Sequence, residues 1–230
     1  MDWLLDGFNF RVLGQYSGVF GHGMFTTVWM SFVCLICSVF FGIFLAIARM
    51  AESPFLWRPA AMYIQAIRAT PLLIQIYLVY YGLPSLLPFG HIFNETQTAL
   101  IALTIHTTPY MAEIIRAGID SVSIGQIEGA RSVGMSSFQT FHHVVLPQAL
   151  ANVTPPMLGQ TAVLIKDTSY FSIIAVFELM GAGLTMFSET VMPTESYVAT
   201  AVCYLIIYLF TLAFSEYIKK RLGGSAWQTM

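Results

Sequence analysis

Two charged residues stand side by side within an apolar stretch of the C-terminal half. Lys166 and Asp167 lie inside residues 149–186, where most neighbours are hydrophobic. An ionisable side chain inside a membrane costs several kcal/mol, so its presence there indicates a function. Adjacent residues on a helix point in different directions, so these two are not expected to pair with each other. They either complement the two charges of a zwitterion or lock neighbouring helices together.

A second charged pair lies earlier in the chain. Glu113 and Arg116 are three residues apart, a spacing that allows an ion pair along one helix face. Arg68 precedes another apolar run and is expected to anchor that run at the membrane surface or to act as a gate. Glu113 and Arg68 therefore either stabilise the helices or line a path for a polar substrate.

Residue types that hold metals or nucleotides occur without their required partners. Cys34-x-x-Cys37 has no second ligand pair, and His142-His143 cannot both face one metal on a helix, so no metal site is expected. The phosphate-binding pattern Gly-x4-Gly-Lys-Ser/Thr is absent, because Gly159–Lys166 has the wrong spacing. The chain is expected to carry no cofactor of its own.

The composition indicates a lipid environment. Of 230 residues, 57% are hydrophobic and 10% are charged, and the mean hydropathy is +0.70. Soluble domains carry roughly a quarter charged residues. The net charge of -2 and the lack of a basic tract exclude nucleic acid as an expected partner. Residues 1–23 show no cleavable signal peptide.

The long apolar runs predict an all-α integral membrane protein, because helices satisfy their own backbone in lipid. Five spans are expected, at residues 24–48, 70–88, 99–117, 154–176 and 197–215. A short non-spanning segment without an assigned location follows within residues 177–195. The chain is expected to form one domain, with an N-terminal outer segment (1–23) and a transmembrane core (24–222).

Basic residues set the expected orientation. With five spans, eight of the ten basic residues fall on one side, and that side is cytoplasmic by the positive-inside rule. The N-terminus is then outside and the C-terminus inside. The eight residues are Arg49, Arg58, Arg68, Arg116, Arg131, Lys219, Lys220 and Arg221.

The first span has small residues at four-residue intervals. Ser38, Gly42 and Ala46 would share one helix stripe. Small residues on one stripe let helix backbones approach closely in lipid. The stripe is either a packing seam or a chance result of the many glycines and alanines.

The longest cytoplasmic connection, residues 120–147, is expected to form a helix, a break and a second helix. Residues 126–133 form the first helix, with Glu128 in its first turn, where a negative charge suits the helix dipole. Gly134 occupies a C-cap position.

Ser136 then opens the second helix with Gln139 as its capping-box partner, and Pro147 marks its end. This helix would project an apolar surface, which either binds a partner or lies on the membrane. The projecting residues are Phe138, Phe141, Val144 and Val145.

This connection resembles the EAA loop of ABC importer permeases. Glu128-Gly129-Ala130, then Gly134, then Val144-x-Leu146-Pro147 follow the spacing of that motif. Gly129 departs from its middle alanine but keeps a small residue there.

Further segments resemble the polar amino-acid uptake family of these permeases (histidine, glutamine, glutamate and arginine type), over roughly residues 20–222. Tyr170 stands where leucine is usual, and residues 106–109 depart from a run of small residues. The similar segments are Arg68-Ala69-Thr70-Pro71-Leu72-Leu73-Ile74-Gln75, Ala112-Glu113-Ile114-Ile115-Arg116-Ala117-Gly118-Ile119, Gly125-Gln126, Leu146-Pro147-Gln148-Ala149 and Lys166-Asp167-Thr168-Ser169.

The resemblance implies a type I ABC importer permease fold whose cytoplasmic coupling helix seats in an ATPase subunit. The residues implied in coupling are Glu128, Gly129, Ala130, Gly134, Phe138, Leu146 and Pro147. The candidates for the substrate path are Lys166, Asp167, Thr168, Ser169, Glu113, Arg68 and Thr70.

The implied assembly contains a second permease subunit (a paralogue or an identical copy), two cytoplasmic ATPase subunits and a periplasmic amino-acid-binding protein. ATP and Mg²⁺ would be held by the ATPase subunits. The implied location is the bacterial cytoplasmic (inner) membrane. A polar amino acid would cross by alternating access, and the sequence does not specify which one.

Three alternative functions fit the sequence less well. Glu128-Gly129-Ala130-Arg131 superficially resembles a membrane phosphatidyltransferase signature, but no Asp or Glu occurs at residues 132–165 to hold the metal. A membrane enzyme is further disfavoured because no Gly-x-Ser-x-Gly motif is present. A secondary transporter would have more spans and two related halves. A non-transporting scaffold would not need the coupling loop.

Overall fold

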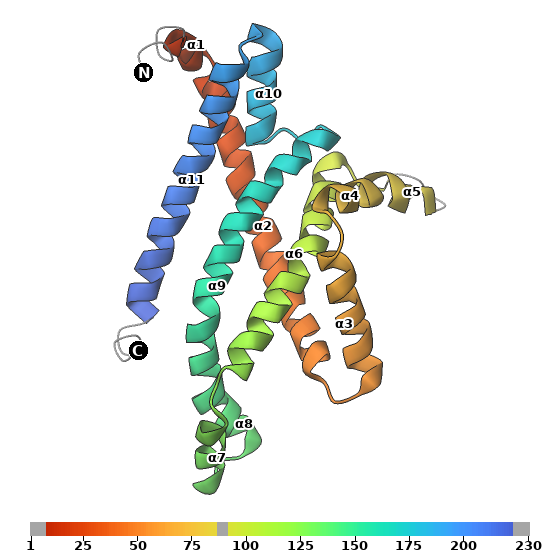
Figure 1. Ribbon diagram of the computed structural model, residues 1–230, viewed down its shortest axis with the longest axis vertical. Coiled ribbons are helices and arrows are strands. Elements are labelled where there is room, and N and C mark those ends of the chain that lie inside the picture. Colours follow the sequence, from red (N-terminus) through yellow and green to blue (C-terminus); the bar gives the residue numbers. More distant parts are fainter. Residues whose placement is uncertain (1–7, 87–91, 223–230) are drawn as a thin grey trace. The chain divides into compact units, whose positions relative to one another are not determined.

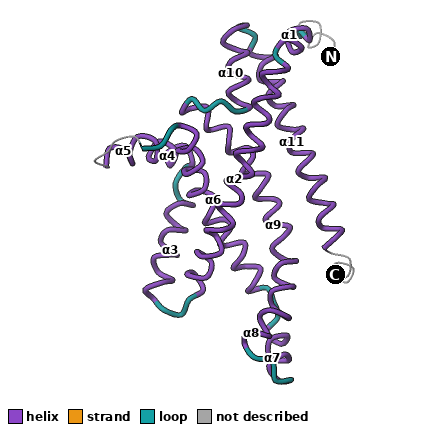
Figure 2. The backbone as a smooth tube through the Cα atoms, turned by 180° about the vertical axis from the view of Figure 1, so that it is seen from behind, coloured by secondary structure: helices purple, strands orange, loops and turns teal. Residues whose placement is uncertain are grey.

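The fold is helical throughout the part of the chain that the structure describes. The computed structural model describes residues 8–86 and 92–222, with side chains up to residue 217. Within these ranges every regular element is a helix (Figures 1 and 2). The all-α prediction is confirmed for these residues, and it agrees with the need to satisfy backbone groups internally in lipid.

Eleven α-helices are described. They are α1 (Phe10–Gln15), α2 (Ser17–Met50), α3 (Pro54–Arg68), α4 (Leu72–Tyr77), α5 (Leu83–Leu86), α6 (Glu95–Asp120), α7 (Ile124–Ser132), α8 (Ser137–Thr140), α9 (Leu146–Asp167), α10 (Leu179–Thr190) and α11 (Pro193–Leu222). Leu78–Gly82 and Phe141–Val145 are π-helical turns, and Thr168–Ile174 is a 3₁₀ helix.

Among the described residues, two single helices are long and apolar enough to cross a membrane, namely α2 and α11 over Pro193–Tyr217. Two bent pairs also qualify if each counts as one span, which raises the number to four. One pair joins α3 to Leu72–Leu86 with a bend of 107°, and the other joins Ser137–Ile174 to α10 with a bend of 47°. The number of five spans and the orientation stay predictions.

The helices differ in extent from the expected spans. The first long helix begins at Ser17 and contains the whole expected span 24–48. The expected span 70–88 becomes helical at Leu72, because Pro71 separates α4 from α3. Proline lacks an N–H and disfavours helical backbone in the residue before it. Residues 87–88 of that run lie outside the described residues, as do the side chains of Lys219, Lys220 and Arg221.

The fourth expected span, 154–176, starts inside a helix that begins earlier. Helix α9 starts at Leu146 and continues through Pro155-Pro156. The predicted helix end at Pro147 is wrong, because the π-helical turn Phe141–Val145 leads into α9 without a gap and the helical run continues through this proline.

A π-helical turn precedes a Leu-Pro pair at two places in the fold. One turn ends before Leu83-Pro84 and the other before Leu146-Pro147. A proline ring collides with the carbonyl four residues earlier in a regular helix. The wider π turn gives the ring room and lets the chain continue as a helix.

The chain divides into two compact units, and four helices run through both. Unit 1 comprises Met1–Cys34, Leu72–Leu103 and Ala162–Thr211, and unit 2 comprises Leu35–Pro71, Thr104–Thr161 and Leu212–Met230. Four of the five divisions fall within α2, α6, α9 and α11, and the fifth falls between α3 and α4. The single permease domain over residues 1–230 stays a prediction.

Unit 1 packs α10 between segments of α2 and α11. Gly23 allows the approach on one side, because a Cβ there would lie 3.0 Å from Ala182 Cβ. On the other side, a Cβ on Gly183 would collide with Thr200. Segment 177–195 thus contributes a helix to a core. The buried residues of that core are Phe20, Ile165, Leu179, Ala182, Met186 and Ile207.

Unit 2 contains the predicted small-residue seam. Ser38, Gly42 and Ala46 are all buried. A Cβ on Gly42 would lie 2.9 Å from Met111 Cβ and 3.3 Å from the Ala112 backbone nitrogen. The stripe therefore packs α2 directly against α6, and the prediction of a packing seam is confirmed.

We expect Gly42→Ala to destabilise the protein by about 1–3 kcal/mol, because the new methyl group overpacks the contact with Met111. Gly21→Ala is the matched control on the same helix, since its Cβ would meet nothing within 4 Å. The control should be neutral or slightly stabilising. Thermal unfolding of both variants in detergent tests this, and equal melting temperatures would contradict the close contact.

Candidate functional site

The connection between α6 and α9 is a pair of capped helices. Helix α7 ends in two hydrogen bonds, from Gly134 N to Arg131 O (3.0 Å) and from Met135 N to Ala130 O (3.2 Å). Gly134 has φ +88°, a left-handed conformation that glycine adopts without strain. This pairing is a Schellman motif, so the predicted C-cap at Gly134 is confirmed.

The start of α8 is also as predicted. Gln139 N donates to Ser136 Oγ at 3.3 Å, and Ser136 N donates to Gln139 Oε1 at 2.9 Å. These reciprocal bonds form the expected capping box. Figures 1 and 2 both show α7 and α8 beside each other.

Glu128 does not lie in the first turn of its helix. Helix α7 begins at Ile124, two residues earlier than predicted, and its first turn contains no acidic residue. Ser123 is the N-cap, and its carbonyl accepts from Gln126 N at 3.0 Å. Glu128 is exposed in the second turn, where the helix dipole no longer favours its charge.

The two short helices present apolar side chains to their surroundings. Ile124, Val133 and Phe138 are 72%, 77% and 76% exposed. The prediction that Val145 projects outward is wrong, because Val145 is buried in a small core with Val122 and Ala149. This core joins the loop to the ends of α6 and α9 and leaves an apolar outer surface.

The other coupling candidates divide between surface and interior. Ala130 is buried and Leu146 is half-buried, whereas Gly129 and Pro147 are exposed. The candidate set is therefore not one continuous surface. Only its exposed members could touch another protein directly.

The first group of substrate candidates lies at the end of α9, in unit 1. Lys166 is exposed and Asp167 is half-buried, and no ion pair joins them. Thr168 is buried and donates its hydroxyl to Ile165 O at 2.8 Å. Ser169 lies in the following 3₁₀ helix, where its carbonyl accepts from Ser172 Oγ. The expectation that adjacent Lys166 and Asp167 do not pair is confirmed.

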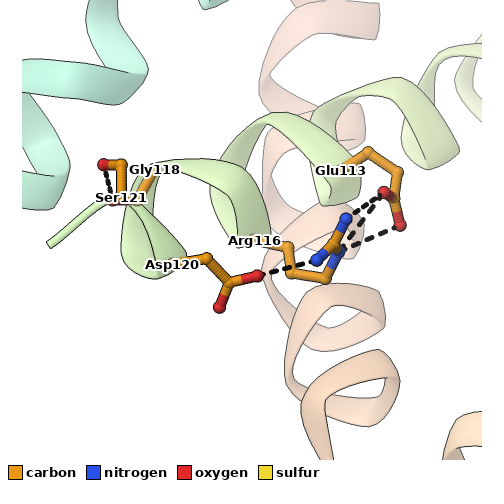
Figure 3. Close-up of polar contacts among 5 residues, drawn as sticks. All are labelled: Glu113, Arg116, Gly118, Asp120 and Ser121. Atoms are coloured by element: carbon orange, nitrogen blue, oxygen red, sulfur yellow. Dashed lines mark hydrogen bonds and ion pairs between the residues drawn. The ribbon is translucent and has the colours of Figure 1, made fainter. Parts of the chain in front are cut away.

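Glu113 and Arg116 form the predicted ion pair on α6 (Figure 3). Arg116 Nη2 lies 2.8 Å from Glu113 Oε2, and Arg116 Nη1 lies 2.7 Å from Asp120 Oδ2. The sequence analysis missed Asp120, although its four-residue spacing from Arg116 permits a contact on one helix face. Arg116 is thus held between two carboxylates.

Arg68 and Thr70 lie at the end of α3. The Arg68 guanidinium carbon is 5.5 Å from the centre of the Tyr110 ring, a cation–π contact. Thr70 donates its hydroxyl to Ala66 O at 2.9 Å and thereby caps the helix. Thr70 has a structural role in this arrangement.

A cavity of about 680 Å³ in unit 2 brings two of the substrate candidates, Arg68 and Glu113, together. Lys166, Asp167, Thr168 and Ser169 belong to the other unit. The polar residues that line the cavity include Arg68, Tyr110, Glu113, Arg116, Asn152 and Gln160.

Sequence reasoning also missed a buried carboxylate in unit 1. Glu178 caps α10, where its Oε1 accepts from Gly181 N and its Oε2 accepts from Met180 N, both at 2.9 Å. Tyr204 of α11 donates its hydroxyl to Oε2 at 2.8 Å, and Thr27 of α2 donates to the same oxygen at 3.5 Å. An acidic residue in an apolar run was the available signal.

Within residues 8–86 and 92–222, no group of three or more His, Cys, Asp or Glu side chains is arranged to hold a metal. His142 instead stacks on Phe138, with ring centres 5.9 Å apart.

Comparison with known proteins gives consistent matches. Residues 38–224 match the family described as "Binding-protein-dependent transport system inner membrane component". The nopaline transport system permease protein of Agrobacterium fabrum is 34% identical over 87% of this chain and 90% of its own length. The L-cystine transport system permease protein of Bacillus subtilis is 31% identical over 94% and 92%. A crystal structure of an amino acid ABC transporter with histidines superposes with a TM-score of 0.86 and 31% identity, over 93% of this chain and 98% of that chain.

We expect Glu178→Gln to destabilise the protein by about 1–3 kcal/mol, because an amide nitrogen cannot accept from the donors that surround the carboxylate. Glu189→Gln is the control. Glu189 is exposed and accepts one bond, from the Tyr16 hydroxyl, which an amide oxygen can also accept. Melting temperatures of the Glu178→Gln and Glu189→Gln variants in detergent test this prediction. An unchanged Glu178→Gln variant would show that the cap does not hold unit 1 together.

Proposed function

Because this chain belongs to the family of inner-membrane components of binding-protein-dependent transport systems, we propose that it carries a polar amino acid into the cell by alternating access. The chain is a permease subunit of an ABC amino-acid importer. Its similarity to permeases named for nopaline and L-cystine, and to the solved amino acid ABC transporter, supports this class of cargo.

The observation that carries the mechanism is the loop between α6 and α9. It has a Schellman motif at one helix end and a capping box at the next helix start, so its bend is fixed by backbone hydrogen bonds and by the side chains of Ser136 and Gln139. The core of Val122, Val145 and Ala149 fixes the loop to the transmembrane helices. Such a rigid connection suits the transfer of an ATPase movement to α6 and α9.

The exposed residues of this loop are the proposed contact with the ATPase. Phe138 would insert into an apolar cleft of that subunit, and Glu128 would meet a basic residue there. Buried Ala130 and half-buried Leu146 would act by keeping the loop in shape. Gly129, Gly134 and Pro147 would complete the loop surface and its bend.

The proposed assembly contains two permease subunits, two cytoplasmic ATPase subunits and an external amino-acid-binding protein. ATP and Mg²⁺ bind to the ATPase subunits. The proposed location is the bacterial cytoplasmic membrane, with several crossings by this chain. The names of the related permeases and the family description support an importer of this composition.

Five crossings are consistent with the helices. Two single spans and two bent pairs would give four. The proposed fifth is α6, whose 26 residues are long enough to cross although it is less apolar than the other four. Arg49 at the end of α2 and Arg58 near the start of α3 then share the cytoplasmic side with the loop, as the positive-inside rule requires. The N-terminus would be outside and the C-terminus inside.

The proposed substrate path includes the end of α9. Lys166 and Asp167 offer both charges that a zwitterion requires, and Ser169 adds a hydroxyl. The Thr168 hydroxyl already donates to Ile165 O, so this buried residue would support the path without contacting the substrate. Glu113 and Arg68 line the cavity in unit 2, and Thr70 supports Arg68 by capping its helix.

The general proposal is tested by reconstitution. The chain is placed in proteoliposomes with its ATPase, its binding protein and, where one exists, its paralogous permease. We expect uptake of a radiolabelled polar amino acid that requires ATP. Uptake that continues without ATP, or ATP hydrolysis that no amino acid stimulates, would refute an ABC importer.

We expect Phe138→Ala to reduce substrate-stimulated ATPase activity about thirtyfold, the effect of losing a contact worth about 2 kcal/mol at the centre of an interface. Its side chain is exposed, so folding should be unaffected. Phe55→Ala is the control, because Phe55 is 90% exposed on α3, outside the loop. Equal ATPase activity in both variants would place the ATPase contact elsewhere.

We expect Gly134→Val to abolish stimulated ATPase activity and Gly134→Asn to retain most of it. Both side chains have open space at this position, so only backbone conformation separates them. Asn tolerates a positive φ, whereas a β-branched residue is strained there. Two variants with the same activity would mean that the bend at Gly134 does not transmit movement.

A further inference from the structure

The cavity in unit 2 has charged residues of both signs. It is lined by Arg68, Arg116 and Glu113 among its charged residues. Asp120 is not among the lining residues, but its carboxylate lies 2.7 Å from Arg116 Nη1. Two cations and two carboxylates therefore stand at the cavity, and their charges balance.

The two arginines differ in what they already bind. Arg116 uses Nη1 on Asp120, and Nη2 and Nε on Glu113. Arg68 forms no ion pair with any described residue, and its guanidinium lies over the Tyr110 ring. A guanidinium over an aromatic face keeps its N–H groups at the edge, where they can donate.

This arrangement suits one chemical group. A guanidinium binds a carboxylate through two parallel hydrogen bonds, and Arg68 has the donors to make them. Glu113 lies on the same cavity. Its Oε1 receives only a long contact, 3.4 Å from Arg116 Nε, so this oxygen retains capacity to accept. The cavity therefore offers a carboxylate-binding cation and an ammonium-accepting oxygen.

We infer that this cavity is a binding site for the transported amino acid within unit 2, in which Arg68 binds the α-carboxylate and Glu113 accepts from the α-ammonium group. The inference rests on the proposed import of an amino acid and adds the substrate class. An uncharged side chain is preferred, because the charges of Arg68, Glu113, Arg116 and Asp120 are all paired once the zwitterion is bound and leave none for an ionised side chain.

The remaining polar lining residues fit this class. Asn152 and Gln160 are amides, which bond well to polar uncharged side chains. Asn152 Nδ2 already donates to Ser121 Oγ at 2.8 Å, so its second amide hydrogen and its oxygen are the groups available. Arg116 is a positioning residue, since its two ion pairs hold Glu113 in place.

The test is direct binding to the detergent-solubilised complex of permease and ATPase, without the binding protein. Scintillation proximity measures binding of tritiated L-glutamine, L-glutamate and L-arginine. The α-carboxamide derivative of glutamine is the competitor. We expect this derivative to compete about tenfold to a hundredfold more weakly than its parent, the loss of a charge-assisted hydrogen bond.

The same measurement on variants isolates Arg68. In Arg68→Gln the affinity for the parent amino acid should fall by the same factor. The difference in affinity between the amino acid and its α-carboxamide should disappear. Arg68→Lys should retain a preference for the acid. Arg58→Gln on the same helix is the control, because Arg58 lies beside Trp57 and does not line the cavity. A merely structural role of Arg68 would weaken acid and amide equally.

Three results would overturn the inference: no saturable binding of any probe to the wild-type complex, tighter binding of glutamate or arginine than of glutamine, or an unchanged preference for the acid in Arg68→Gln. ATP-dependent uptake by the wild-type importer distinguishes a failure of the cavity site from a failure of the general importer proposal. If uptake occurs and these results are found, only the cavity site fails. If uptake is absent, the importer proposal itself fails.

Discussion

The structure depends on one constraint, that polar groups in an apolar medium must find partners within the chain. Many hydroxyl groups along the helices meet it locally, whereas the buried hydroxyl groups of Ser31, Ser38, Thr107 and Thr140 have no hydrogen-bond partner among the described residues. Thr108, Thr154 and Thr161 each donate to a carbonyl of their own helix, four residues back. Charged groups need more partners than hydroxyl groups do. Glu178 accepts hydrogen bonds from donors on three helices, and Arg116 forms ion pairs with two carboxylates.

The same constraint distinguishes the loop between α6 and α9 from the rest of the chain. There the backbone is satisfied by a Schellman motif and a capping box, while large apolar side chains such as Phe138 stay exposed. A lipid-facing helix needs no such elaborate ends, and an ordinary soluble loop would not expose such side chains together. Both features agree with a rigid element that binds a protein.

Close helix packing provides the frame for the cavity in unit 2. Glycines at the contacts of α2 with α6 and of α6 with α9 bring backbones together, and the Tyr63 hydroxyl ties α3 to Ile105 O at 2.9 Å. Arg68 at the end of α3 is thereby brought to Tyr110 and Glu113. A position fixed by several helices suits recognition of a small polar molecule better than a mobile loop does.

The sequence alone determined features whose partners lie within four residues, because helical geometry fixes such distances. The capping box at Ser136, the break at Gly134 and the pair of Glu113 with Arg116 are of this kind. Tertiary structure alone decided which distant segments meet. The partners of Glu178 come from three helices, and Arg68 reaches its cavity because α3 packs on α6, where the Tyr63 hydroxyl donates to Ile105 O. No periodicity in the sequence encodes these contacts, since they depend on how whole helices pack.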